Sequence, residues 1–470
     1  MKKNRLHTLA LSVLFMTATA ASAQQLNTND IMYHSFRSPM ANQLNPALFP
    51  EDSKWFVTFP RVDISMALPI SYNELGLHYD PNTDMSTLNI NDLLNTLDAN
   101  GSSLLAGVNV DILRIGFTVA KRLHFTLDAG LRVSSSIALP TEITRLVTEG
   151  NMDANGNPQE LSLGCDRSTM AQAYAYTSLG GSFDFPTIPL TVGARFNLLH
   201  GAAFLSIDNI DIDINSSIES NSMSLTTDYQ ARSAGLFSLV LDENGNPTLD
   251  YTLGFPQSRG FTFDLGAKYT LNKFEFSASL LNVGPGINWV ENPNIIRPKN
   301  PGQSITFDGI ELSALLNNGS ADTAALNRML DSLLDNISPQ NSEETFWYTV
   351  PTSAYVGANY TLGEYFRVGY LFHGEWSHGW HKGTSFYCNN TLSLTTSLFH
   401  HLDLTVANSF SAGAGGFDAL NPGVALSLNI AKRIQFYISA DYISSLYVAD
   451  IKGFRLFFGL NIVGYSKKSE

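Results

Sequence analysis

The chain has only two cysteines in 470 residues, Cys165 and Cys388. Two thiols can form at most one disulfide bond, so a small scaffold held together by several disulfides is excluded. A single bond would be permitted outside the cytoplasm, and two free thiols fit the sequence equally well.

Long apolar runs are missing as well. No stretch beyond the N-terminus approaches the roughly eighteen apolar residues that a membrane-spanning helix needs. The early apolar run Leu9–Met16 is itself too short to span, and it follows three basic residues. Ala21-Ser22-Ala23 then supplies a small-x-small cleavage site with no lipoprotein cysteine after it. These parts predict a signal peptide over residues 1–23, cleaved near Ala23.

Charged residues are scarce, at 15% of the chain, and most of them are acidic. The 28 Lys and Arg against 42 Asp and Glu give a net charge of −14. Removing residues 1–23 deletes three basic residues and no acidic one, which gives 25 − 42 = −17. Such a balance argues against nucleic acid or anionic lipid as a partner. Low charge, 11% aromatic residues and 35 glycines suit strands that face lipid on one side and a lumen on the other.

The clearest β pattern is a hairpin over residues 260–289. Apolar and polar side chains alternate along both of its arms, as they do on the two faces of a strand. Asn272-Lys273 joins the arms as a two-residue turn. Each arm has about ten residues, the length of a strand that crosses an outer membrane. A second hairpin of the same kind is predicted over residues 107–139.

The hairpin unit recurs along the chain. GAKYTL at 266–271 returns as GANYTL at 357–362, and AKRLHF at 120–125 returns as AKRIQF at 431–436. The charged turns are short, as periplasmic turns of outer-membrane barrels are. Further strands are predicted at 171–185, 190–199, 203–216 and 223–233, and from 346 to the end. The total is about fourteen strands, which predicts an all-β, transmembrane antiparallel β-barrel over residues 54–470.

Two regions depart from this pattern. Residues 24–53 have no strong periodicity and form a separate N-terminal segment. Residues 292–342 interrupt the strands, and within them DTAALNRMLDSLLDN at 322–336 has leucines at helical spacing. We therefore expect a helical loop insertion near 305–340, with shorter helices in the other long loops.

Several ordered segments point to a family. They are PTEITRLVTEGN, FDLGAKYTLNKFEFSASLLNVGPGINW, YTVPTSAYVGANYTL, and IQFYISADYISSLY followed by GFRLFFGLNI. Over about residues 45–463 the chain resembles an uncharacterised family of Bacteroidota outer-membrane β-barrel proteins, a domain of unknown function. Asn45-Pro46-Ala47 resembles an element of FadL-type fatty-acid channels and of PorV-like proteins linked to type IX secretion. The resemblance implies a FadL-like barrel in which residues 24–53 could fold into the lumen as a hatch.

Metal-capable residues are densest in FHGEWSHGWHKG, which contains His373, His378 and His381. On a helix this spacing would suit a metal ion, but the glycines and the preceding strand predict a loop at the membrane interface. These histidines are weak metal candidates, and no metal or other cofactor is predicted. No catalytic motif stands out either, so we expect a protein that is not an enzyme.

Five charged residues fall on the non-apolar faces of predicted strands, where a lumen would spare them the cost of facing lipid. These lumen-lining candidates are Asp264, Lys268, Arg367, Asp441 and Arg455. They could shape a permeation path or pair with one another inside a plugged barrel.

The sequence thus predicts an integral outer-membrane protein that contacts lipid and binds or passes a small molecule, which could be hydrophobic. An alternative is a non-transporting scaffold or accessory subunit of a type IX secretion or gliding-type machine, with secretion proteins as partners. A soluble, secreted β-sandwich adhesin is a third hypothesis, less favoured because its strands would be shorter.

Overall fold

The structure is a computed structural model. It describes residues 30–465 except 52, 69, 76, 81–84, 101–102, 139–160, 165–168, 218–221, 244–245, 253, 309–315, 318–319, 322–337, 364, 379–383, 399–401, 414–415, 431–432, 442 and 444–449. The predicted signal peptide and the predicted helix at 322–336 lie outside the described residues. Among the described residues, no helix is long and apolar enough to cross a membrane.

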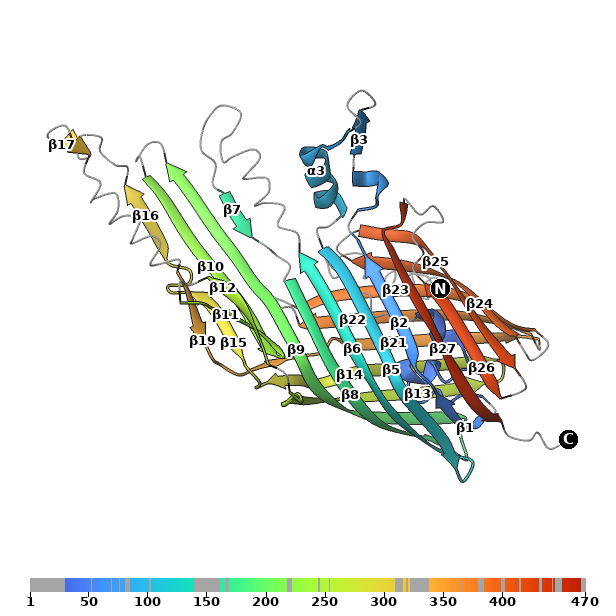
Figure 1. Ribbon diagram of the computed structural model, residues 1–470. Coiled ribbons are helices and arrows are strands. Elements are labelled where there is room, and N and C mark those ends of the chain that lie inside the picture. Colours follow the sequence, from blue (N-terminus) through green and yellow to red (C-terminus); the bar gives the residue numbers. More distant parts are fainter. Residues whose placement is uncertain are drawn as a thin grey trace, which may run out of the picture.

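A closed antiparallel barrel dominates the fold (Figure 1). Among the described residues, fourteen strands form its wall when the collinear β1 and β2 are counted as one, as the sequence predicts. In order around the wall they are β1 (Ser53–Thr58) with β2 (Arg61–Ala67), β5 (Ser103–Val119), β6 (Leu123–Ala138), β8 (Thr169–Asp184), β9 (Leu190–Ser217), β13 (Ser258–Leu271), β14 (Phe274–Trp289), β21 (Thr352–Leu362), β22 (Phe366–His378), β23 (Thr384–Leu398), β24 (Leu402–Gly413), β25 (Gly416–Ile430), β26 (Ile434–Asp441) and β27 (Gly453–Tyr465).

The wall closes where the last strand meets the first. Phe56 of β1 faces Val463 of β27, and Ile64 of β2 faces Leu456 of the same strand. On their other side, β1 and β2 both pair with β5. Among the described residues, each of the fourteen wall strands pairs with a neighbour on both sides, so its backbone groups have partners within the wall.

The two ends of the barrel differ. One end has short turns such as 120–122 and 272–273, where Ala120, Lys121 and Asn272 adopt the positive φ angles of tight hairpin turns. The opposite end carries the long connections. Those between β2 and β5 contain η2 (Asn73–Leu75), β3 (Leu77–Asp80), β4 (Met85–Leu88) and α3 (Ile90–Asn100).

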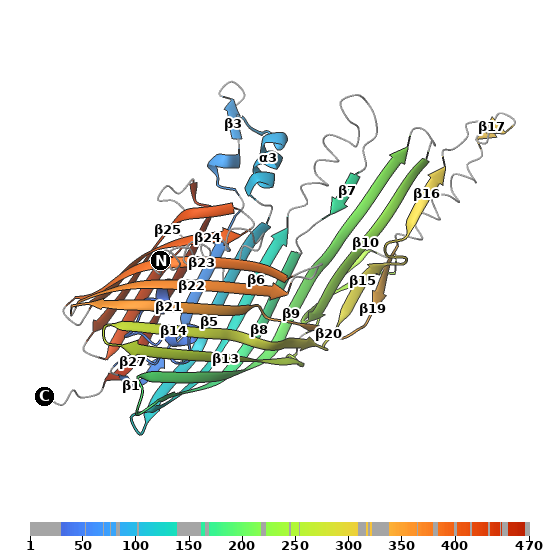
Figure 2. The ribbon, with the colours of Figure 1, turned by 180° about the vertical axis from the view of Figure 1, so that it is seen from behind.

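At the long-connection end, part of the sheet extends beyond the barrel (Figure 2). β9 is one strand of 28 residues, which corrects the prediction of separate strands at 190–199 and 203–216. The strand stays continuous because it changes partner, pairing with β13 up to Gly201 and with β10 from Ala203 onward. The additional strands of this sheet are β7 (Leu161–Gly164), β10 (Ser222–Gly235), β11 (Phe237–Leu241), β12 (Pro247–Tyr251), β15 (Asn294–Pro298), β16 (Ser304–Asp308), β19 (Pro339–Ser342) and β20 (Phe346–Tyr348). β17 (Leu316–Asn317) and β18 (Ser320–Ala321) pair with each other in a separate two-stranded sheet.

Side chains alternate between an apolar exterior and a polar interior. On β24, Val406 is 47% exposed, whereas its neighbours Thr405 and Ala407 are buried. The same alternation exposes Leu394 on β23 and Val424 on β25, the cross-strand partners of Val406. An apolar exterior on a closed barrel is the face that lipid covers in outer-membrane proteins.

We therefore expect Val406→Arg to destabilise the barrel in lipid vesicles by about 2–4 kcal/mol, because the guanidinium would face hydrocarbon. Urea titration followed by unboiled electrophoresis measures this change. Val406→Leu, which keeps the apolar surface, is the control and should unfold at the wild-type urea concentration. An arginine tolerated at this position would show that lipid does not cover this face.

Candidate functional site

Residues 30–51, called the lumen segment below, lie inside the barrel. The segment contains η1 (Asp30–His34), all of whose residues are buried, and α2 (Ala41–Leu44). Tyr33 stacks on Tyr355 of β21 with ring centroids 5.8 Å apart, and its hydroxyl donates to Ser277 Oγ of β14 at 2.9 Å. Among the described residues, no backbone–backbone hydrogen bond joins residues 30–49 to a wall strand. The lumen segment is therefore held by side-chain contacts rather than by the sheet.

Asn45-Pro46-Ala47 forms the turn that seats the lumen segment against β13 and β14. Asn45 Nδ2 donates to the carbonyl oxygens of Ala267, at 3.3 Å, and Ala278, at 3.1 Å, which face each other across the two strands. Its Oδ1 accepts a hydrogen bond from the backbone N–H of Ala47 at 2.9 Å. The Asn45 side chain thus stabilises its own turn and also bonds that turn to strands β13 and β14.

A glycine in the wall lets the turn approach so closely. A Cβ atom at Gly193 of β9 would lie 2.6 Å from the carbonyl carbon of Pro46 and 2.7 Å from the backbone nitrogen of Ala47. Both are backbone atoms, which cannot rotate away as a side chain can. Any other residue at this position must displace the turn.

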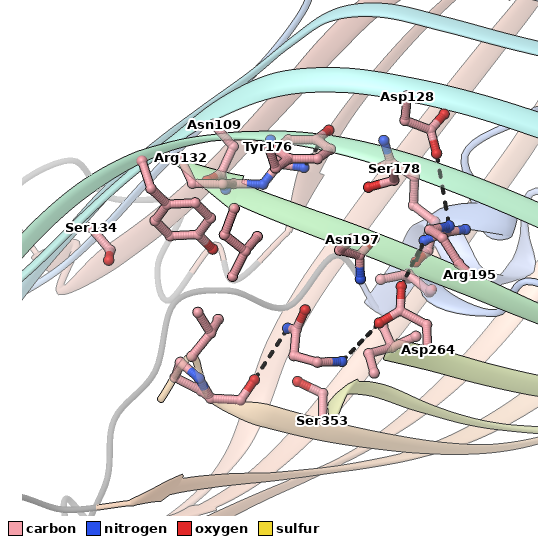
Figure 3. Close-up of a pocket in the computed structure, with 18 of the residues that line it drawn as sticks. Asn109, Asp128, Arg132, Ser134, Tyr176, Ser178, Arg195, Asn197, Asp264 and Ser353 are labelled. Carbon is pink, nitrogen blue, oxygen red and sulfur yellow. Dashed lines mark hydrogen bonds and ion pairs between the residues drawn. The ribbon is translucent and has the colours of Figure 1, made fainter. Parts of the chain in front are cut away.

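Arg195 of β9 connects the wall to the lumen segment. Its Nη1 lies 3.2 Å from Asp264 Oδ2, and its Nε lies 3.7 Å from Asp128 Oδ2 (Figure 3). The same guanidinium donates to the backbone carbonyl of Gln43 at 3.1 Å. Arg195 is therefore shared between two carboxylates and the lumen segment.

Asp111 of β5 is the second centre of charge. It accepts from Arg61 at 2.9 Å, from Arg132 at 2.7 Å and from the Tyr176 hydroxyl at 2.6 Å, and it also binds the Gln43 amide. Burying these groups costs desolvation energy that their mutual attraction must offset. The members of such a network stabilise one another. Removing one of them leaves its partners buried without a hydrogen-bond or ion-pair partner.

A third contact completes the link between wall and segment. The Arg114 guanidinium of β5 is fully buried, lies 2.9 Å from Asp128 Oδ1 and donates to the Asn42 side chain of the lumen segment. Asn42 in turn donates to the Pro46 carbonyl at 3.1 Å. The charged wall residues therefore bind the segment close to the turn described above.

A chamber of about 170 Å³ opens beside this network. Cavities of about 150 Å³ can hold a molecule the size of benzene, so the chamber has room for a small molecule. Gln43 and Leu44 of the lumen segment form part of its surface, and the rest is mostly polar wall. The wall residues that line it include Arg61, Asp63, Asp128, Arg132, Gln172, Tyr174, Tyr176, Arg195, Asp264, Leu281, Val350, Ser353, Glu375 and Arg455.

Two of the five lumen-lining candidates border this chamber. Asp264 is 3% exposed and binds Arg195, and Arg455 is 3% exposed, with its Nε 2.8 Å from Asp63 Oδ1. Lys268 lies on the same face of β13 as Asp264 but nearer the short turn, where it is half-buried. The structure therefore brings Asp264 and Arg455 to one cavity and leaves Lys268 apart from it.

The other two candidates contact the lumen segment. Asp441 Oδ2 accepts from the backbone N–H of Ile31 at 3.5 Å. Arg367 forms an ion pair with Glu51 at 2.9 Å and lies over the Phe36 ring. Neither residue lines the chamber among the described contacts, and both join the wall to residues 30–51.

The prediction that His373 lies in a loop is wrong. β22 continues to His378 because β21 and β23 pair with it past Gly374. His373 is fully buried inside the barrel, stacked on Tyr355 with centroids 4.2 Å apart and 3.3 Å from Asp30 Oδ1. The side chain of His378 and all of His381 lie outside the described part. Within that part, no group of three or more His, Cys, Asp or Glu side chains could hold a metal ion.

Sequence patterns did not single out Arg114, Asp111, Arg195 or Glu375. Each lies at an inward-facing position of its strand. Because side chains alternate between the two faces of a strand, this alternation could have predicted that each residue faces the lumen. The partners could not be found in this way, because Arg195 and Asp264 are 69 positions apart and meet through strand register. Which charged residues form ion pairs therefore depends on how the strands are aligned in the closed barrel wall.

Comparisons with solved structures find barrels at low sequence identity. A Pseudomonas aeruginosa FadL homologue is 10% identical, with a TM-score of 0.44, covering 95% of this chain and 100% of that one. The Pseudomonas putida toluene transporter TodX is 11% identical, with a TM-score of 0.41 and coverages of 91% and 92%. The Ralstonia pickettii toluene transporter TbuX is 9% identical, with a TM-score of 0.41 and coverages of 91% and 94%.

Sequence comparison places the chain in a family. No curated protein matches it significantly. The model of DUF5723, a family of unknown function, matches residues 46–441, which is most of the chain and includes nearly all of the barrel. This closed β-barrel protein therefore belongs to the family of unknown function DUF5723.

Proposed function

We propose that the protein binds a small molecule in the chamber and passes it across the outer membrane, with the lumen segment as a movable hatch. One observation carries the proposal: a cavity inside the barrel is bounded by a segment whose residues 30–49, among the residues described, make no backbone–backbone hydrogen bond to a wall strand. Such a segment can move without opening the wall, because only side-chain contacts have to break. The role is transport or binding rather than catalysis.

A second candidate function is a closed scaffold or accessory subunit of a surface machine. The ion-pair network around Arg195 and Asp111 favours it, since these contacts would hold the segment in the lumen permanently. The two functions differ in whether solute crosses the barrel. A scaffold would stay sealed and would be recovered together with partner proteins.

Gly193→Ala separates the two functions. The added Cβ must displace the Pro46 turn, so we expect vesicles containing this variant to exchange small solutes several-fold faster than wild-type vesicles. Gly181→Ala on the adjacent strand is the matched control, because its Cβ would meet other atoms only at ordinary distances of 3.6–3.9 Å. Sealed vesicles for both variants, with both proteins folded, would reject transport and favour the scaffold.

A further inference from the structure

Among the described residues that line the chamber, Glu375 is a carboxylate without a cation at ion-pair distance. Among its described lining residues, Asp63, Asp128 and Asp264 each have an arginine within ion-pair distance. Glu375 of β22 is 2% exposed. Its carboxyl group hydrogen-bonds to Ser353, while its Oε1 has no partner. A buried acceptor in this state costs free energy until a donor reaches it.

A second hydrogen-bond acceptor, on another part of the wall, also has no partner. Gln172 of β8 is 5% exposed and lines the same chamber, and its Oε1 has no hydrogen-bond partner. Tyr174, two residues along on the same face of β8, lines the chamber together with Gln172 and Glu375. Two acceptors without a hydrogen-bond partner therefore belong to residues that line one cavity, one on β8 and one on β22.

The cations around the chamber are already engaged. Arg61 and Arg132 share Asp111, Arg195 binds Asp264, and Arg455, which acts electrostatically on Glu375, is bound to Asp63. A ligand carboxylate would have to compete with these pairs. A ligand amine would instead supply the donors that the two free oxygens need.

We propose that the chamber selects small molecules that carry a primary amino group in its protonated, cationic form. Glu375 binds this ammonium group through its carboxyl oxygens, and the amide oxygen of Gln172 accepts a hydrogen bond from it. This inference rests on the proposed function, because it names the substrate class of the same chamber. Leu44, Leu281 and Val350 line the chamber as well, and they give a short hydrocarbon chain an apolar surface. The volume limits the ligand to about the size of one aromatic ring or a short diamine.

Calorimetric titration of the full chain in detergent tests this with three probes of equal chain length: 1,4-diaminobutane, 1,4-butanediol and succinate. We expect the diamine to bind and succinate not to bind. Glu375→Gln removes the charge while keeping the shape, and it should weaken diamine binding about tenfold or more, as loss of a charge-assisted hydrogen bond does. Gln172→Ala should weaken it by a smaller factor.

Glu275→Gln is the matched control, since Glu275 of β14 is a partly buried carboxylate that is not among the described lining residues. It should bind the diamine as the wild type does, and heat-modifiable mobility verifies that every variant is folded. Equal binding of diol and diamine, or a Glu375→Gln protein that binds the diamine normally, would overturn the inference. If solutes cross the vesicle membrane without preference for amines, the amine inference is wrong and the proposed transport function stands. If the protein binds the amine but the vesicles remain sealed, the transport function is wrong and the amine inference stands.

Discussion

A chain without residues 30–50 is expected to conduct ions steadily in planar bilayers, whereas the full chain is expected to be closed for most of the time. The deletion removes the segment that crosses the lumen and leaves every wall strand and its ladder in place. Arg114, Asp111 and Arg195 would then face water in the lumen rather than the segment. Single-channel recording measures the difference, which should exceed tenfold in mean current.

A smaller change tests the same idea if the deletion impairs folding. Asn45→Ala removes the two hydrogen bonds to β13 and β14 and should raise the frequency of channel openings. Asn246→Ala is the control, because that amide bonds only to Asp242 in an exposed turn among the contacts described. A folded deletion variant with wild-type conductance would mean that the lumen segment does not close the barrel.

Asp111→Ala is expected to lower the free energy of unfolding by about 3–5 kcal/mol, the usual cost of breaking a buried charge network from one side. Arg61 and Arg132 would remain inside the barrel without the carboxylate they share, and Tyr176 and Gln43 would lose an acceptor. Urea titration in vesicles, read by unboiled electrophoresis, measures the loss.

Glu344→Ala provides the comparison for Asp111→Ala. Glu344 also pairs with an arginine, Arg297, at 3.3 Å, but the side chains of Glu344 and Arg297 are 58% and 42% exposed. Exposed pairs contribute little to stability, so this variant should unfold with the wild type. Equal effects of the two substitutions would show that the inward face of the barrel is as well hydrated as its surface.

The local architecture could be predicted from the sequence because it depends on a period of two. The hairpin at 260–289 is confirmed as β13 and β14, with the turn at Asn272-Lys273 between them. The errors occurred where neighbouring strands decide the outcome. β9 continues through 200–202 because β10 takes over from β13, and β22 continues past Gly374 because two partners extend with it.

The candidate site was less accessible to prediction. Alternation identified Asp264 and Arg455 as charged residues on polar faces, and the chamber borders both. It could not show that Arg195 lies between Asp128 and Asp264, because these residues meet only when three hairpins align. Nor could it distinguish a paired carboxylate from an unpaired one such as Glu375, since that difference depends on distances across the lumen.

The contacts of the lumen segment also set the order in which the protein can assemble. Ile31 reaches Asp441 across 410 positions of sequence, and Asp30 binds Asn389 across 359. The segment is synthesised before any wall strand, yet its binding surface exists only after β26 and β27 have joined β1. The contacts of residues 30–51 with these strands can therefore form only after β23 and β26 are in place. Protection of this segment from protease would then report the last step of barrel biogenesis.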